Sequence, residues 1–491
     1  MKYHSTRDKE LNISAAQAIA DGIAADGGLY VPESIPKLGD ISPLLGMDYQ
    51  DRAARVMSMF LDEFTLEELS DFSRKAYAEN FDVTEIAPVK KFDDNTLILE
   101  LWHGPTAAFK DMALQIMPHL LSASLKKTGE TREVCILVAT SGDTGKAALE
   151  GFSDVPGTRI VVFYPRDGVS NVQEKQMTTQ RGANVLVSAV VGNFDDTQTG
   201  VKNIFADREF ASAIDERGFF LSSANSINWG RLLPQIAYYV SAYCDAVNGG
   251  TIESGDGINF CVPTGNFGNI LAGWYAKQMG LPIDKLICAS NANNVLTEFI
   301  ETGVYDRNRD FHLTMSPSMD ILVSSNLERL LYNASGDDKL VAGYMDALSS
   351  DGRYAINDAI KTEIDSVFSA GYCDDEETKL QIADTFRNGG YLLDTHTAVA
   401  VSVLGKYRKL TGDTTPTVVV STASPYKFAD SVLASLGESI PQSGAEQIDR
   451  LYEISGVSPP LPLMDLDSRE VRFGDWIEKD DMLKLAEEFL R

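Results

Sequence analysis

VCILVATSGDTGK, residues 134–146, reads as a β-strand, a short polar loop and the start of a helix. The apolar run Val134–Ala139 has the length of one buried strand, and the loop after it is rich in small residues. Comparable apolar runs, separated by helical stretches, recur at Arg159–Tyr164, Val185–Val191, Phe219–Ser222, Asn259–Pro263, Lys285–Ser290 and Thr417–Ser421. This alternation is typical of βαβ units, so we predict an α/β fold built on doubly wound, mostly parallel sheets.

The rest of the chain flanks this core. The N-terminal region has helical patterns at Ile13–Ala25 and Tyr49–Tyr77, typical of a small separate α/β domain. A second region, mostly helical and rich in charge, interrupts the strand–helix alternation late in the chain and predicts a helical insertion. The predicted boundaries are 1–95 for the N-terminal domain, 96–302 with 393–440 for the core, 303–392 for the insertion and 441–491 for a C-terminal tail that wraps over the surface.

The chain is strongly acidic, with 43 Lys and Arg against 71 Asp and Glu and a net charge of −28. This charge repels nucleic acid and anionic membranes, so we expect neither as a partner, and an anionic substrate would need a local cluster of donors. The five cysteines are widely spaced and show no disulfide framework or metal-ligand spacing, so no metal is predicted. Without an apolar leader or a membrane-length apolar run, the expected location is cytoplasmic.

The candidate nucleophile is Lys110, which lies in Leu101–Met117, LWHGPTAAFKDMALQIM. A turn at His103–Thr106 leads into an apolar segment where a helix could begin, so Lys110 would lie at a helix N-terminus. Burial and the positive end of the helix dipole both disfavour an ammonium group there. A neutral lysine amine is the nucleophile of Schiff-base chemistry. The alternative, which this stretch alone favours, is a surface lysine paired with Asp111.

A candidate phosphate-binding loop is Pro263–Asn269, PTGNFGN, between a predicted strand and a predicted helix. Its two glycines let the backbone approach an anion, and the helix start supplies oriented N–H groups. A dinucleotide site is disfavoured because the G-x-G-x-x-G pattern is absent. A P-loop at Gly145-Lys146 is excluded because Thr140 and Ala147 stand where that motif needs glycine and serine or threonine.

Ser223–Arg231, SANSINWGR, also follows a predicted strand. Asn225, Ser226 and Arg231 offer amide, hydroxyl and guanidinium donors, a combination suited to a phosphate or a carboxylate. The alternative is that the Asn and Ser residues cap the next helix while Arg231 is exposed.

STASPYKF, residues 421–428, follows the last predicted strand. A helix start with an N-cap explains Ser424 and Pro425. It does not explain Ser421 and Thr422, which stand at the carboxyl end of the strand, where side chains face the crevice of an open α/β sheet.

Seven motifs occur in order across nearly the whole chain: YHSTR, DGGLYVPE, HGPTAAFKD, SGDTG, NSINWGRLLPQI, PTGNFGN and STASPYKF. As a set they resemble the threonine synthase family, which are pyridoxal-phosphate enzymes of the tryptophan-synthase β fold type. SPSMDILVSSNLERLL in the insertion resembles the longer-chain form of that family. The resemblance implies two lobes around a cofactor cleft, pyridoxal 5'-phosphate as the cofactor and a lyase reaction in threonine biosynthesis.

The resemblance also implies a role for each candidate residue. Lys110 would form the Schiff base with the cofactor and then act as a base, and Thr422 would hydrogen-bond the pyridine nitrogen. The other implied assignments are Gly265, Asn266, Phe267, Gly268 and Asn269 for the cofactor phosphate, and Thr140, Ser141, Thr144, Asn225, Ser226 and Arg231 for the carboxylate or phosphate of the substrate.

Asp143 departs from the fold type, in which an asparagine usually contacts the ring oxygen of the cofactor. An ionised aspartate would repel a phenolate at that position. The longer-chain relatives tolerate aspartate, so Asp143 stays among the cofactor-binding residues, with orientation of Thr144 as its alternative role.

The implied reaction converts O-phosphohomoserine and water into L-threonine and phosphate by β,γ-elimination and replacement. Lys110 would remove the Cα proton and shuttle a Cβ proton, and phosphate would leave Cγ before water adds at Cβ. Two alternatives stand beside this hypothesis: a pyridoxal-phosphate-dependent phospho-lyase that releases 2-oxobutyrate, and a catalytically silent α/β binding protein. The sequence leaves the oligomeric state open between monomer and homodimer.

Overall fold

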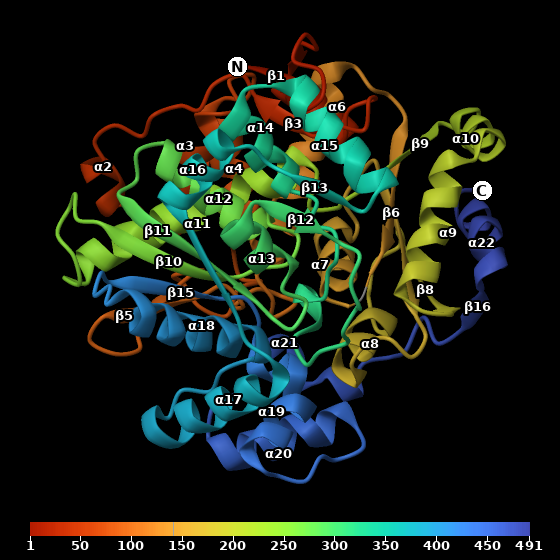
Figure 1. The fold of residues 1–491 in the computed structure, drawn as a ribbon. Helices are drawn as coiled ribbons and strands as arrows, with labels where there is room; N and C mark the ends of the chain where they lie inside the picture. The colour runs from red at the N-terminus through yellow and green to blue at the C-terminus, as the bar shows by residue number, and fades with distance from the viewer. Residues whose placement is uncertain (141) are drawn as a thin grey trace.

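Two mostly parallel sheets organise the molecule, of which the computed structural model describes residues 1–140 and 142–491 (Figure 1). The larger sheet has the strand order β14-β11-β10-β15-β5-β4, and β4 alone among these six runs antiparallel to its neighbour. Its strands are β4 (Val89–Lys91), β5 (Thr96–Glu100), β10 (Ile258–Pro263), β11 (Ile283–Ser290), β14 (Phe368–Tyr372) and β15 (Thr417–Ser421). Helices α12 (Gly268–Gln278) and α18 (Thr395–Thr411) pack on β10 and β11, on opposite sides of the sheet in Figure 1.

The second sheet has the order β16-β8-β7-β6-β9, with all neighbours parallel. Its strands are β6 (Glu133–Ala139), β7 (Thr158–Pro165), β8 (Val185–Val191), β9 (Phe219–Ser222) and β16 (Trp476–Glu478). Its helices are α7 (Asp143–Phe152), α8 (Asn171–Thr178), α9 (Phe194–Ala206) and α10 (Arg208–Asp215). The two sheets form two lobes, which confirms the predicted fold class.

Helix α11 (Trp229–Asn248) connects β9 of the small lobe to the large lobe and is buried over nearly its whole length. It packs against α12, against α5 (Asp111–Leu114) and against α3 of the N-terminal region. Helix α6 (Met117–Thr128) follows α5 and contacts the same region through α1. The elements that carry the predicted site loops therefore surround one buried helix.

The N-terminal region packs on α11 and α6 as a small α/β unit. Its antiparallel strands are β1 (Lys2–Ser5), β2 (Ile13–Ser14) and β3 (Tyr30–Pro32), and its helices are α1 (Ala15–Asp21), α2 (Ser42–Leu45), α3 (Tyr49–Ser58) and α4 (Leu66–Ala76). Side-chain caps fix where the two amphipathic helices begin, Asp48 for α3 and the capping box of Thr65 and Glu68 for α4.

Residues 303–392 are mostly helical, but they also supply β14, an edge strand of the large sheet. After α13 (Val295–Thr302), the strands β12 (Val304–Asp306) and β13 (Arg353–Ala355) form a small antiparallel pair. Two of the helices lie between these two strands in the sequence. The helices of this region are α14 (Leu327–Ser335), α15 (Asp338–Ser350), α16 (Asp358–Val367) and α17 (Asp375–Gly389).

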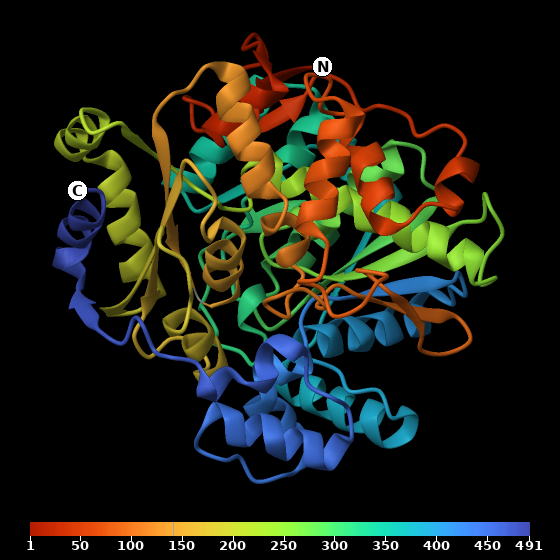
Figure 2. The same cartoon turned by 180° about the vertical axis from the view of Figure 1, so that it is seen from behind.

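The C-terminal tail runs from the large lobe to the small one, as the blue segment of Figure 2 shows. After β15 the core ends with a 3-10 turn (Pro425–Phe428) and α19 (Ala429–Leu436), and the tail then contains α20 (Gly444–Ser455), α21 (Leu461–Met464), β16 and α22 (Met482–Phe489). Because β16 pairs with β8, the tail covers the surface and also completes the edge of the small sheet. Within the described residues, no helix is long and apolar enough to cross a membrane.

Candidate functional site

The loops after β5 and β15 meet because these strands are parallel neighbours in the large sheet. The backbone N–H of Phe109 donates to the carbonyl of Thr422 over 2.8 Å, and that of Ser424 donates to the carbonyl of Ala107 over 3.0 Å. Ala107 has φ of 57°, a left-handed conformation that turns the chain sharply just before the lysine. Backbone pairing thus places Lys110 beside buried Thr422.

Lys110 stands at the N-cap position of α5, with a side chain only 11% exposed. Its Nζ lies 3.8 Å from an oxygen of Asp143 and 3.4 Å from the hydroxyl of Ser318. Burial lowers the pKa of Lys110; Asp143 opposes this, and two nearby cations, from Lys427 and Arg231, reinforce it. The amine therefore loses its proton more readily than that of an ordinary lysine.

Asp111 is not the partner of this lysine. Its buried carboxylate accepts hydrogen bonds from the backbone N–H and the hydroxyl of Thr106, each over 2.8 Å. Burial raises the pKa of Asp111 to about 7. The surface-pair alternative is therefore wrong, and Asp111 instead fixes the turn that precedes Lys110.

Asp143, the first residue of α7, is buried in a cluster of donors. One carboxylate oxygen forms an ion pair with Lys427 Nζ at 2.9 Å and accepts a hydrogen bond from the amide of Gln173 over 2.8 Å. Burial on its own would raise the pKa of Asp143, but the cations of Lys427 and Lys110 hold it well below its usual range. No hydrogen bond from Asp143 to Thr144 is found among the described residues, so the alternative role as an orienter of Thr144 has no support in the geometry.

Lys427 is the functional candidate that sequence reasoning did not single out. Its side chain is fully buried, and besides Asp143 it donates to the carbonyl of Thr106 (2.8 Å) and to Gln176 (3.0 Å). The signal was present in STASPYKF, where a lysine stands between aromatic residues directly after a buried strand. A buried ammonium group needs an anionic partner, and Asp143 was the acidic residue of the opposite loop.

The glycine loop leads into α12 as expected for an anion site. Phe267 has φ of 62°, and its ring packs against Phe368. Phe267 stands at the N-cap position, so the loop backbone leads directly into the start of α12. Gly265 is closely covered, because a Cβ there would lie 2.6 Å from the carbonyl of Ser318. Asn266 is exposed, and Gly268 and Asn269 form the first turn of α12.

Asn269 carries an unused donor at this helix start. Its side-chain oxygen accepts from the hydroxyls of Tyr238 and Tyr239, each over 2.7 Å. Its Nδ2 is buried and has no hydrogen-bond partner in the part of the chain that the structure describes. An unsatisfied buried N–H group at a helix N-terminus is suited to an anion.

Arg231 lies in the first turn of α11 and is only 4% exposed. It donates to the carbonyl of Ala224, while its Nε is buried without a partner and no carboxylate pairs with it among the residues described. Burial lowers the pKa of Arg231 to about 10. The helix is capped by Asn228, which accepts from Gly230, so the alternative of an exposed Arg231 beside capping Asn225 and Ser226 is wrong.

The remaining predicted residues lie in the same loops. Thr140 is buried, and its hydroxyl oxygen accepts from the N–H groups of Gly142 and Gly145, so it also holds the loop before α7. Asn225 is exposed, Ser226 and Thr144 are half-buried, and Ser141 lies outside the described residues.

The insertion reaches into the site, which the sequence did not specify. Ser318 contacts Lys110, and its backbone N–H donates to Nε2 of His396 over 3.2 Å. Ser324 donates to the carbonyl of Gly265, and the Asn326 side chain donates to the carbonyls of Ser226 and Asn266. Residues 318–326 thus join the lysine, the glycine loop and the arginine loop.

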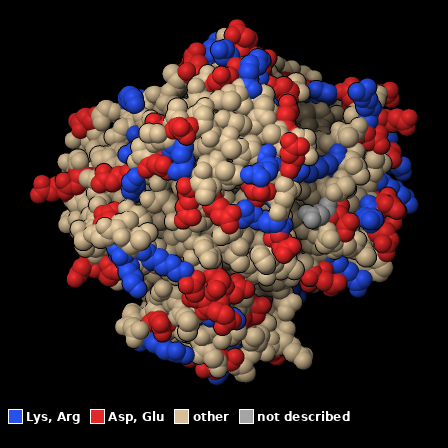
Figure 3. Space-filling model, viewed as in Figure 1, with Lys and Arg blue, Asp and Glu red and all other residues tan. Residues whose placement is uncertain are grey.

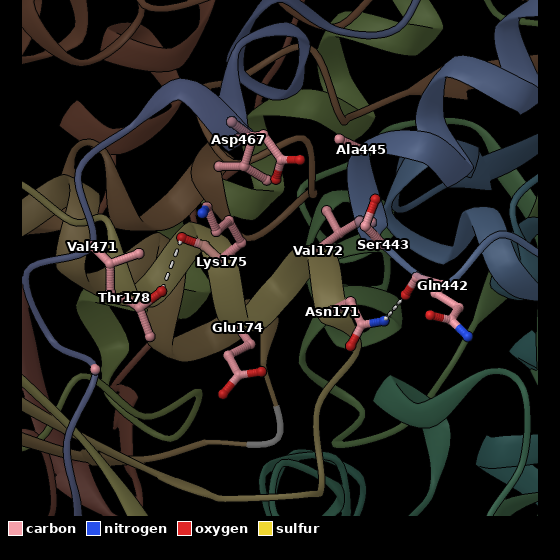
Figure 4. Close-up of a pocket in the computed structure, with 13 residues that line it drawn as sticks. Asn171, Val172, Glu174, Lys175, Thr178, Gln442, Ser443, Ala445, Asp467 and Val471 are labelled. Carbon is pink, nitrogen blue, oxygen red and sulfur yellow. Dashed lines mark hydrogen bonds between the residues drawn. The ribbon is translucent and has the colours of Figure 1, made fainter.

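A separate cavity of about 430 Å³ lies on the side of α8 that faces away from Asp143 and Lys427 (Figure 4). Gln173 and Gln176 of this helix face Asp143 and Lys427, whereas the side chains that line the cavity belong to its opposite face and to the C-terminal tail. None of the predicted site residues lines it. In the described part of the chain, no group of His, Cys, Asp and Glu is arranged to hold a metal ion.

A buried, readily deprotonated lysine, a helix start with an unused donor and a glycine at 265, where a side chain would collide with the backbone of Ser318, fit a phosphorylated aldehyde cofactor. The fold and the site define a pyridoxal-phosphate-dependent enzyme, and the family model described as "Pyridoxal-phosphate dependent enzyme" matches residues 84–423. Models described as "Threonine synthase N terminus" and "Threonine synthase, C-terminal" match residues 2–77 and 397–478. The chain belongs to the threonine synthase family.

Relatives and solved structures agree with this placement. Threonine synthase of Pseudomonas aeruginosa is 40% identical over 478 residues, which covers 96% of this chain and 95% of that protein. The crystal structure of pyridoxal-phosphate-bound threonine synthase from Brucella melitensis superimposes with a TM-score of 0.88, at 39% identity, over 100% of this chain and 98% of the other. Human threonine synthase-like 1 is 42% identical over 471 residues, but this chain spans only 62% of its length.

Proposed function

We propose that this protein is a threonine synthase that converts O-phosphohomoserine and water into L-threonine and phosphate. The names of the bacterial and yeast relatives support the proposal, the yeast threonine synthase being 37% identical over 462 residues. The human relative is longer and is named only threonine synthase-like, so its name alone does not support this reaction.

One observation carries the proposal, the buried guanidinium of Arg231 without a carboxylate partner in the described residues. A buried cation is costly unless an anion pairs with it, so the site is built to receive one. The charge of Arg231 lies close enough to Lys110 to lower the pKa of the lysine amine. In a protein of net charge −28, with acidic side chains spread over the face in Figure 3, such a local site is what a phosphorylated substrate requires.

The site thus offers two positions for an anion, one at Arg231 and one at the start of α12. We assign the α12 position, with Gly265, Asn266, Phe267, Gly268 and Asn269, to the phosphate of the cofactor. When bound, pyridoxal phosphate supplies an electron sink that makes protons at Cα and Cβ of the substrate acidic. The Thr422 hydroxyl would hydrogen-bond the pyridine nitrogen and orient the ring.

Lys110 then has the role of anchor and proton carrier. Released by the incoming substrate, its amine would take the proton from Cα and carry a proton from Cβ, for which a lowered pKa is an advantage. Arg231 would hold the phosphate as it leaves Cγ, through the paired donors of its guanidinium group. Asn225, Ser226, Thr140, Ser141 and Thr144 are the assigned contacts to the substrate's carboxylate or phosphate.

The test is to incubate the purified, cofactor-loaded protein with O-phosphohomoserine and to follow phosphate, threonine and 2-oxobutyrate together. We expect phosphate and threonine in equal amounts. Homoserine, which lacks the phosphate group, is the matched control substrate and should give no threonine. Phosphate released with 2-oxobutyrate but without threonine would identify a phospho-lyase instead. A loaded protein that releases no phosphate would be a catalytically silent relative.

A further inference from the structure

The side chain of Lys427 is fully buried, and the structure gives its ammonium group three acceptors. These are Asp143, the backbone carbonyl of Thr106 and the side-chain oxygen of Gln176, at 2.9, 2.8 and 3.0 Å. The contacts to Thr106 and Gln176 are hydrogen bonds, and the contact to Asp143 is an ion pair. Lys427 is thus held in place by partners inside the protein.

Asp143 lies between this lysine and the candidate nucleophile. One of its oxygens contacts Lys427 at 2.9 Å, and the other lies 3.8 Å from Nζ of Lys110. Coulomb attraction between opposite charges grows as they approach, so the shorter of these two buried contacts is the stronger one. Lys427 is therefore the resident counter-ion of Asp143, and Lys110 is its secondary partner.

A buried carboxylate without a cation is strongly disfavoured. Without Lys427, the remaining ion-pair partner that the structure gives Asp143 is Lys110, which would then be held as an ammonium ion. An ammonium ion is neither a nucleophile nor a base. Of the other charged groups near Lys110, Arg231 on α11 opposes this protonation and Asp111 on α5 favours it.

We propose that Lys427 is a positioning residue that neutralises Asp143 and so allows Lys110 to give up its proton. The inference rests on the proposed role of Lys110 as nucleophile and base. It also explains how an aspartate is accommodated beside that lysine, because Asp143 and Lys427 together form a neutral pair.

The variants that test this are Lys427→Met, Asp143→Asn and the double variant D143N/K427M. Lys146→Met is the matched control, since Lys146 is also a buried lysine of the same region but pairs with Glu150 at 2.7 Å. The readout is the rate at which cyanate modifies Lys110 at pH 8, measured by mass spectrometry on the full-length protein freed of cofactor with hydroxylamine. Cyanate reacts with neutral amines, so the rate reports the deprotonated fraction of Lys110.

We expect K427M to slow modification of Lys110 about tenfold, the effect of one unit of pKa. The double variant should return to the wild-type rate, D143N alone should be at least as fast as wild type, and K146M should match wild type. A folded K427M protein whose Lys110 reacts at the wild-type rate would overturn the proposal. A double variant as slow as K427M would do the same, because Lys427 would then act without Asp143.

If K427M fails to fold, the comparison of D143N with D143N/K427M decides the question. Similar rates in these two proteins support the proposal, and a tenfold slower double variant contradicts it. The measurement needs no substrate. Modification rates as expected in a protein that makes no threonine would therefore defeat the proposed function and leave this inference standing.

Discussion

Lys110 is the residue on which the chemistry depends, and its replacement gives the most direct prediction. Lys110→Ala should abolish the visible absorption band of the lysine-bound cofactor and reduce kcat for threonine formation by at least about 1,000-fold, because anchor and proton carrier are lost together. Absorption spectra and product assays of the purified variant check this. Lys75→Ala is the control, since Lys75 is an exposed lysine paired with Asp71. A K110A protein that kept the band would show that another lysine holds the cofactor.

Replacement of Arg231 should lower activity without lowering stability. Arg231→Met should lower kcat/KM for O-phosphohomoserine about 100-fold, since a hydrogen bond to a charged group contributes roughly 1.5–3 kcal/mol. It should not lower the melting temperature measured without substrate, because it removes a buried cation that has no carboxylate partner in the described residues. Steady-state kinetics and thermal unfolding measure the two quantities.

The matched control for Arg231 is Arg74→Met, which removes an exposed arginine paired with Asp51. It should leave kcat/KM unchanged. Arg231→Lys keeps the charge without the planar pair of donors, so its kcat/KM should lie between wild type and R231M. An R231M protein with wild-type kcat/KM would remove Arg231 from the substrate site.

Sequence motifs identified the loops of the site better than the interactions within them. The glycine loop and the arginine loop were singled out because each follows a predicted strand, and Lys110 because a turn and an expected helix start surround it. The pairing of Lys427 with Asp143 and the burial of Arg231 depend on contacts between distant segments. No local periodicity encodes such contacts, so they required the structure.

At the scale of elements, strands with a continuous apolar sequence were predictable, whereas two short or weakly apolar edge strands were not. The predicted runs at 185–191, 219–222 and 417–421 coincide with β8, β9 and β15, because each of these strands has a continuous, mostly apolar sequence. Strand β16 is three residues long and exposes both Trp476 and Glu478, and β14 has the weak pattern FSAGY. Because β14 and β16 lack a continuous apolar signal, residues 303–392 were predicted to be a helical insertion and the tail to wrap over the surface.

The turn between β5 and α5 should show a pH-dependent contribution to stability through His103. Burial would lower its pKa, but hydrogen bonds to Asp82 (2.6 Å) and Glu100 (3.0 Å) raise it overall. A raised pKa in the folded protein stabilises it below the unfolded value of about 6.5, and this stability is lost as pH rises through the folded pKa. The melting temperature of wild type should therefore exceed that of His103→Gln by an amount that shrinks from pH 5.5 to 8.5.

His119 is the control of opposite sign in the same region. Burial lowers its pKa, so its contribution is present at high pH and is lost as pH falls below about 6.5. The melting temperature of wild type should therefore exceed that of His119→Gln by an amount that grows from pH 5.5 to 8.5. The same trend in both variants would mean that a global effect of pH, and not these two imidazoles, controls the melting temperature.

At the scale of the whole molecule, the C-terminal tail fastens the small lobe, which carries Asp143 and Gln173, to the large one. Strand β16 extends the small sheet next to β8, and Arg166 stacks over Trp476 at 4.6 Å. Helix α22 then packs on α9 with Met482 at the centre of the contact, only 1% exposed. Contacts made near the chain end thus extend the sheet and the apolar core of the lobe that carries Asp143.

Met482→Ala tests this attachment. Removing a buried methionine leaves a cavity and costs about 2–5 kcal/mol, so α22 and β16 should detach more easily. We expect a lower guanidinium midpoint for the small lobe and faster proteolysis within residues 470–491, measured by limited digestion and mass spectrometry. Met464→Ala, at a methionine that is 59% exposed, should behave as wild type. If M482A resists protease as well as M464A does, the tail is held by its strand pairing alone, and α22 contributes nothing to holding the two lobes together.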